Sequence, residues 1–102
     1  MEQTERIMHM EEILNEALAA VETLDKALEQ YEAVRRRIGE LESYYASRQW
    51  MTDFEDDAQG KLPPDLKRGV LSEDAVYNLL ADNDWLMERI RRIAECAGKK
   101  RG

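Results

Sequence analysis

The chain has 102 residues, enough for one domain with a modest core. Its hydrophobic share of 43% and charged share of 36% are typical of long helices and too apolar for a disordered chain, so we predict an all-α protein. A single cysteine, Cys96, excludes an intramolecular disulfide, and no apolar run approaches the about 18 residues of a membrane span. Because the first residues are acidic where a secretory signal is basic, we expect a cytoplasmic protein that contacts no membrane.

The formal net charge of −7 is concentrated at the start of the chain. Residues 1–34 hold nine acidic and two basic residues, whereas the remaining two thirds are balanced. In the last third the acidic residues come early and the basic residues come late. An antiparallel last helix would therefore bring its basic end beside the acidic start, although each exposed charge pair contributes only about 0.2 to 1 kcal/mol.

Residues 4–46 have the periodicity of one long amphipathic helix. Apolar side chains return at alternating spacings of three and four, and we call this set the apolar stripe: Ile7, Met10, Leu14, Ala17, Val21, Leu24, Leu28 and Tyr31. A parallel row widens the stripe beyond what one partner helix can cover: Ile13, Ala20, Ala27, Val34 and Leu41. After Tyr31 the register slips by one residue, and Gly39 weakens the helix by about 1 kcal/mol relative to alanine.

A second, short helix is predicted at residues 48–58. Ser47 is placed to cap it, Trp50 and Phe54 lie one turn apart on one face, and Gly60 stands where the helix would end. Residues 60–71 form a connector, because Pro63 and Pro64 forbid a continuous helix.

The last helix is predicted at residues 73–97, followed by a basic tail at residues 98–102. Ser72 is its expected cap and Gly98 its expected stop. Its expected buried face comprises Val76, Leu79, Leu80, Leu86, Met87, Ile90, Ile93, Ala94 and Ala97. About 25 residues, or roughly 37 Å, cannot cover a first helix of roughly 63 Å. We therefore expect residues 1–102 to form a single helical domain with the shape of a hairpin. Either residues 50–66 fold back along the first helix, or a second copy covers the excess length, or both occur. We favour both, in a dimeric bundle.

Several segments resemble one family of small bacterial proteins. They are Arg6-Ile7-x-x-Met10-Glu11, Tyr44-Tyr45-Ala46-Ser47, Trp50-Met51-x-Asp53-Phe54-Glu55, Gly60-Lys61-Leu62-Pro63, and the run from Asp65 to Leu80. The family is a domain of unknown function, number 4298, and the resemblance covers nearly the whole chain. It implies a bacterial, stand-alone helical protein, and it carries no activity, cofactor or catalytic residue to transfer.

An aromatic group around the predicted turn is the candidate partner surface. Its members are Tyr44, Tyr45, Trp50, Phe54 and Tyr77. Aromatic anchors dominate the binding energy of many interfaces, but a small bundle also needs bulky side chains at its closed end. Both interpretations are open, and the core interpretation is favoured.

The connector offers a candidate anion site. Lys67, Arg68 and Ser72 lie near the amino end of the last helix, where backbone amides and the helix dipole favour phosphate or carboxylate. The alternative is a rigid turn whose charges are solvated, and it is the more frequent case.

Other chemistries have weak support in the sequence. His9 shares a helix face with Glu5 and Glu12, but a bundle metal site needs histidines from two helices. The acidic residues after Asp53 do not have the spacing of a calcium loop. One cysteine far from one histidine gives little basis for catalysis. The net charge argues against nucleic-acid binding by the basic runs 35–37 and 99–101.

We therefore expect a non-enzymatic interaction or structural module without a cofactor or metal. Its expected partners are a second copy of itself and another protein. The alternative is a regulatory protein that binds a small ligand or phosphate through Lys67, Arg68 and the start of the last helix.

Overall fold

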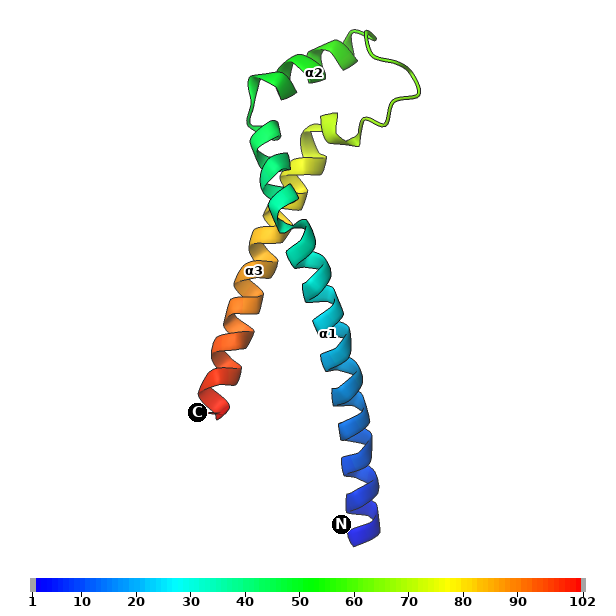
Figure 1. The fold of residues 1–102 in the computed structure, drawn as a ribbon, viewed down its shortest axis with the longest axis vertical. Helices are drawn as coiled ribbons and strands as arrows, with labels where there is room; N and C mark the ends of the chain where they lie inside the picture. Colours follow the sequence, from blue (N-terminus) through cyan, green and yellow to red (C-terminus); the bar gives the residue numbers. More distant parts are fainter. Residues whose placement is uncertain (1, 102) are drawn as a thin grey trace. The chain divides into compact units, whose positions relative to one another are not determined.

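The computed structural model describes the backbone of residues 2–101 and the side chains of residues 2–98. It is all-α, as the composition predicts, and no strand occurs in the described part (Figure 1). The elements are α1 (Gln3–Tyr45), α2 (Arg48–Ala58), the short 3-10 helix η1 (Gly69–Leu71) and α3 (Glu73–Arg101). The side chains of the predicted basic tail, Lys99 to Arg101, and the terminal Gly102 lie outside the described residues.

The chain divides into two units by its internal contacts. The N-terminal unit is residues 1–38 and the C-terminal unit is residues 39–102. The boundary falls inside α1, directly before Gly39, and the helix is continuous there. A side chain at Gly39 would meet no atom within 4 Å, so no close approach requires glycine at this position. The cost of about 1 kcal/mol for one glycine does not end a helix of this length.

The N-terminal unit consists of one stretch of α1. It contains no proline, and Glu5 in the first turn complements the positive end of the helix dipole. Lys26 pairs with Glu22 one turn earlier at 3.1 Å. None of the described residues of α1 is buried. The N-terminal unit therefore has no core of its own.

Local chemistry sets both ends of α2. The hydroxyl of Ser47 accepts a hydrogen bond from the backbone N–H of Trp50 at 3.2 Å and donates to the carbonyl of Tyr44 at 2.5 Å. At the other end Gly60 takes a φ of 72°, which is readily adopted by glycine alone. The N–H groups of Gly60 and Lys61 then bond the carbonyls of Asp57 and Asp56, each at 3.0 Å, in a Schellman arrangement.

The connector returns the chain from α2 to α3 through a turn and η1. The N–H of Leu66 bonds the carbonyl of Pro63 at 3.2 Å, and Pro64 supplies the fixed φ that such a turn uses. η1 contacts both α2 and the start of α3. The buried core of the C-terminal unit comes from these three elements, with Trp50 from α2, Leu71 from η1 and Val76 from α3.

α3 differs from the prediction at its end and on its face. The helix continues through Gly98 to Arg101, because Gly98 does not adopt the positive φ by which a glycine ends a helix. Of the expected buried face, only Val76 is buried, whereas Leu80 and Met87 are half-buried and the other members are exposed. The reason is that no helix packs along α3 in the described structure, since η1 alone makes close backbone contact with it.

None of the helices, over the residues described, combines the length and the low charge that crossing a membrane requires.

Candidate functional site

Trp50 is the centre of an aromatic group at the start of the C-terminal unit. Its ring stacks on Phe54 with centroids 5.1 Å apart and planes inclined by 19°. Tyr45 meets the same ring edge-on, also at 5.1 Å. The indole N–H of Trp50 donates to the carbonyl of Val70 at 2.9 Å, so the one polar atom of a buried side chain is satisfied. This group joins the end of α1 and α2 to η1.

The two tyrosine hydroxyls at the end of α1 also bond within the C-terminal unit. Tyr45 donates to the carbonyl of Glu73 at 3.1 Å, at the first residue of α3. Tyr44 donates to the carboxylate of Asp53 at 2.6 Å. This hydrogen bond, followed by burial and by the charge of Asp53, raises the pKa of Tyr44 to about 12, because each disfavours the tyrosinate.

The candidate partner surface is therefore divided by the structure. Tyr44, Tyr45, Trp50 and Phe54 contact one another or their neighbours inside the C-terminal unit. Tyr77 stands apart from them, with 64% of its surface exposed. The first four side chains therefore make contacts within the C-terminal unit, Tyr77 is the exposed member, and a partner surface formed by this group stays a prediction.

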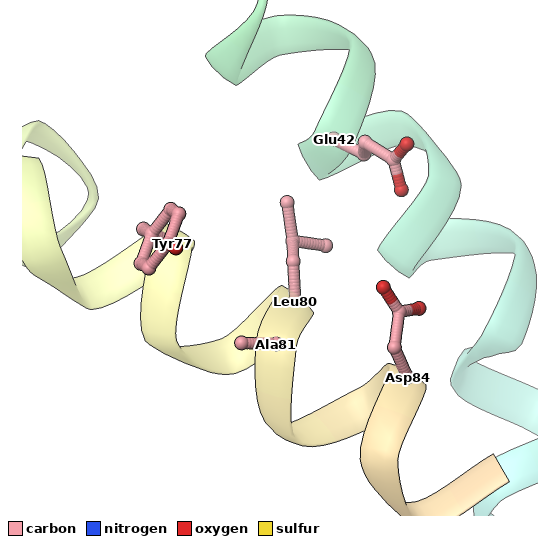
Figure 2. A pocket seen from close by; sticks show the side chains of 5 residues that line it. All are labelled: Glu42, Tyr77, Leu80, Ala81 and Asp84. Atoms are coloured by element: carbon pink, nitrogen blue, oxygen red, sulfur yellow. The ribbon is translucent and has the colours of Figure 1, made fainter. Parts of the chain in front are cut away.

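Tyr77 lines an open pocket of about 330 Å³ with four other residues. They are Glu42 from α1 and Leu80, Ala81 and Asp84 from α3. Figure 2 shows Leu80 and Asp84 projecting from α3 toward the last turns of α1, from which Glu42 projects. Two carboxylates beside an apolar floor would suit a cationic group. Two acidic side chains at an open surface do not by themselves define a ligand, so we assign no function to this pocket.

The candidate anion site is not assembled into one polar cluster. The guanidinium of Arg68 forms an ion pair with Asp57 and donates to the carbonyls of Pro63 and Leu66 at 2.7 and 3.3 Å. These bonds close the connector on itself and use the donors that an anion would need. Ser72 is exposed directly before α3.

Lys67 has different surroundings from Arg68. It is exposed and lines a second pocket, of about 340 Å³, whose other lining residues are Tyr44, Asp53, Leu62, Leu66, Val70 and Leu71. This pocket is mainly aliphatic, and Asp53 on its wall opposes an anion. Binding of phosphate through Lys67 and Arg68 stays a prediction, with only Lys67 free of a hydrogen bond or ion pair in the described structure.

The apolar stripe on α1 is exposed along its length. Its large aliphatic members are exposed over about a third to two thirds of their surface, and Val21 reaches 68%. Ile13 and Val34 in the adjacent row are exposed too. Large contiguous apolar surface on a helix marks a site for another helix, whereas isolated exposed apolar residues do not.

A second exposed apolar surface lies on α3. We call it the α3 face and define it as Leu86, Ile90 and Ile93, which follow one another at spacings of four and three. Sequence reasoning assigned these residues to the core and did not single out Trp85, which is 60% exposed beside them and carries the guanidinium of Arg89 over its ring at 5.5 Å. A tryptophan next to a heptad-like row was the available signal.

Metal-binding geometry is not present in the described residues. No group of three or more His, Cys, Asp and Glu side chains among them is placed to hold a metal ion. His9, Glu5 and Glu12, which share one helix face, belong to the N-terminal unit.

The fold and its exposed surfaces define a small all-α protein whose buried residues, among those described, lie in the C-terminal unit and whose apolar helical faces are exposed. The chain belongs to the domain of unknown function family DUF4298, whose model matches residues 7–93. This match confirms the family resemblance seen in the sequence. No curated protein and no solved structure matches the chain.

Proposed function

We propose that this protein is a non-enzymatic interaction module that self-associates through the apolar stripe of α1, in the bacterial cytoplasm. The observation that carries the proposal is the absence of any buried residue among those described in α1, although the helix carries a heptad pattern over more than three repeats. Covering one large aliphatic side chain completely contributes about 1.5–3 kcal/mol. The stripe therefore favours association with another helix.

A second copy of the chain is the occupant that we propose for the stripe. Helices in proteins gain most of their stability from packing against other elements, and the N-terminal unit has no core of its own to provide such packing. From Ile7 to Tyr31 the apolar residues alternate strictly between spacings of three and four. This is the heptad pattern by which helices pair along their length in coiled coils. The additional row that includes Ile13 and Val34 supports a bundle of more than two helices, which a dimer of this chain can provide.

The stripe itself can be tested by paired substitutions on opposite faces of α1. Leu14→Asn with Leu24→Asn places two amides in the stripe, and we expect the dissociation constant of the dimer to rise at least tenfold. The matched control is Ala19→Asn with Ala33→Asn, which makes a similar helix-propensity change on the opposite face and should leave association unchanged. Size-exclusion chromatography with light scattering over a concentration series measures both.

Equal weakening by the two pairs would show that helix propensity and not the stripe controls association, and it would contradict the proposal. Circular dichroism on each variant establishes that α-helix is retained. A folded wild-type protein that stays monomeric at tens of micromolar would also overturn it.

A further inference from the structure

We propose that the second pocket, which Lys67 lines and which we call the connector pocket, binds a free aliphatic amino acid such as leucine. Three observations carry this inference: the pocket has an aliphatic wall, it is lined by one carboxylate and one ammonium group, and these two charges are not paired with each other. Every lining residue belongs to the C-terminal unit. The inference therefore goes beyond the proposed self-association of the N-terminal unit and does not depend on it.

The wall of the connector pocket is formed by four aliphatic side chains from the connector and η1. Leu71 is buried and Leu62 and Val70 are half-buried, whereas 47% of the surface of Leu66 is exposed. The pocket volume of about 340 Å³ lies within the range of about 300–1,000 Å³ that is usual for small-molecule sites. A branched aliphatic side chain placed against this wall would remove the exposed surface of Leu66 from water, which favours binding.

Asp53 supplies the negative charge of the pocket. The hydroxyl of Tyr44 donates to its Oδ2 at 2.6 Å, and because this bond raises the pKa of Tyr44 to about 12, the tyrosine keeps its proton at neutral pH. A carboxylate accepts through both oxygens, so Oδ1 can accept a further hydrogen bond. Asp53 is half-buried, where a charge acts more strongly than it does in bulk water. These surroundings suit the ammonium group of a ligand.

Lys67 supplies the positive charge from the connector. Its side chain is exposed and makes no hydrogen bond or ion pair in the described structure. The neighbouring Arg68 pairs with Asp57 and donates to the carbonyls of Pro63 and Leu66, and these bonds hold the backbone beside Lys67. The three donors of the Lys67 ammonium therefore stand on a fixed segment and suit the carboxylate of a ligand.

The combination of groups selects a zwitterion with an aliphatic body. An anion that approaches Lys67 also meets Asp53, and a cation that approaches Asp53 also meets Lys67, so a ligand with a single charge is opposed by the group of like charge. A free amino acid offers an ammonium to Asp53, a carboxylate to Lys67 and a side chain to the wall. In a peptide the two charged groups stand at opposite ends of the chain, so a single residue presents both only as the free amino acid.

A set of matched ligands tests the recognition of each part. L-Leucine is compared with 4-methylpentanoate, which lacks the ammonium, with 3-methylbutylamine, which lacks the carboxylate, and with glycine, which lacks the side chain. We expect L-leucine to bind about tenfold or more tightly than each of the others, because each lacks one charge-assisted or apolar contact. Isothermal titration calorimetry measures the affinities, and amide shifts in heteronuclear NMR spectra should locate the bound ligand at Leu66, Lys67 and Val70.

Two substitutions assign the charges of the pocket. Asp53→Asn keeps an acceptor for Tyr44 and should abolish the preference for L-leucine over 4-methylpentanoate. Lys67→Gln should abolish the preference for L-leucine over 3-methylbutylamine. The matched controls are Asp65→Asn and Lys61→Gln, which make the same changes at exposed connector residues that do not line this pocket, and both should bind L-leucine like wild type. Because each variant is judged by a ratio of two ligands, a general loss of fold cannot imitate the expected result.

Three results would overturn the inference. The first is the absence of shifts at the connector pocket when wild-type protein is titrated with L-leucine to millimolar concentration. The second is an unchanged preference for L-leucine in both Asp53→Asn and Lys67→Gln, which would place the ligand elsewhere. The third is tighter binding of inorganic phosphate than of L-leucine, lost in Lys67→Gln, which would make the connector an anion site.

Discussion

Trp50 is one of the three buried hydrophobic side chains of the C-terminal unit among the described residues. Only 7% of the surface of Trp50 is exposed. Its ring contacts two aromatic rings, and its indole N–H donates a hydrogen bond to the carbonyl of Val70. Trp85 has the same side chain on α3 but remains 60% exposed. Comparing substitutions of these two tryptophans therefore separates the effect of losing a buried side chain from the effect of losing a tryptophan as such.

We expect Trp50→Ala to lower the free energy of unfolding of the C-terminal unit by about 3–5 kcal/mol, because it removes a buried aromatic side chain and leaves a carbonyl without its donor. Trp85→Ala should change it by about 0.5–1 kcal/mol, the size of an exposed cation–π contact. Urea unfolding followed by circular dichroism measures both. Equal effects of the two substitutions would refute the role given to Trp50.

Tyr44 gives the unit a dependence on alkaline pH. Its pKa is raised from 10.0 to about 12 in the folded chain, chiefly by the hydrogen bond to Asp53. A raised folded pKa means that the stabilisation is fully present below about pH 10 and disappears as the pH rises through about 12. We expect Tyr44→Phe to be less stable than wild type at neutral pH, with the difference vanishing at the alkaline end of this window.

Absorbance titration of the tyrosines provides a direct measurement of this ionisation. The step near pH 12 should be missing from Tyr44→Phe and should move to lower pH in Asp53→Asn, which keeps an acceptor but removes the charge. Persistence of that step in Tyr44→Phe would assign it to another tyrosine.

At the scale of elements, short-range signals were the most predictable part of the chain. Ser47 caps α2 and Gly60 closes it because each acts on backbone groups within three or four residues. Gly98 carries the same signal as Gly60 and does not end α3, because a glycine stop also needs following residues that turn back on the helix. Local sequence identifies a candidate stop, and the chain beyond it decides the outcome.

The Ser47 cap has a measurable effect on α2. We expect Ser47→Ala to destabilise the C-terminal unit by about 1 kcal/mol, since the N–H of Trp50 loses its acceptor, and Ser47→Asp to retain most of the stability. Ser43→Ala, at an exposed interior position of α1, is the control and should cause no loss. Thermal unfolding followed by circular dichroism compares the three, and a loss in Ser43→Ala equal to that in Ser47→Ala would argue against the cap.

Long-range contacts could not be predicted in the same way. Periodicity showed that α3 has an apolar face, but it could not show that η1 is the one described element packed against α3 or that Val76 is the one buried residue among those described in this helix. The sequence placed Lys67 and Arg68 side by side, whereas the pairing of Arg68 with Asp57 depends on how the connector folds. The sequence identified the aromatic group, but it could not show which of its members contact one another and that Tyr77 is exposed.

At the scale of the whole molecule, the chain joins a unit with a small core to a helical unit with none. The C-terminal unit has its own aromatic centre, caps and closing turn. The apolar stripe on the N-terminal unit has the regular heptad spacing of a helix–helix interface, and its described side chains are exposed. This combination is the basis of the proposal that the N-terminal unit associates with a second copy of the chain.

The most direct test of this account is sedimentation equilibrium of the wild-type chain across a concentration series that includes tens of micromolar. Self-association through the apolar stripe predicts the mass of a dimer at high concentration and dissociation to the monomer on dilution. It also predicts that the melting temperature rises with protein concentration. The mass of a single chain at every concentration, with full helical content, would contradict it.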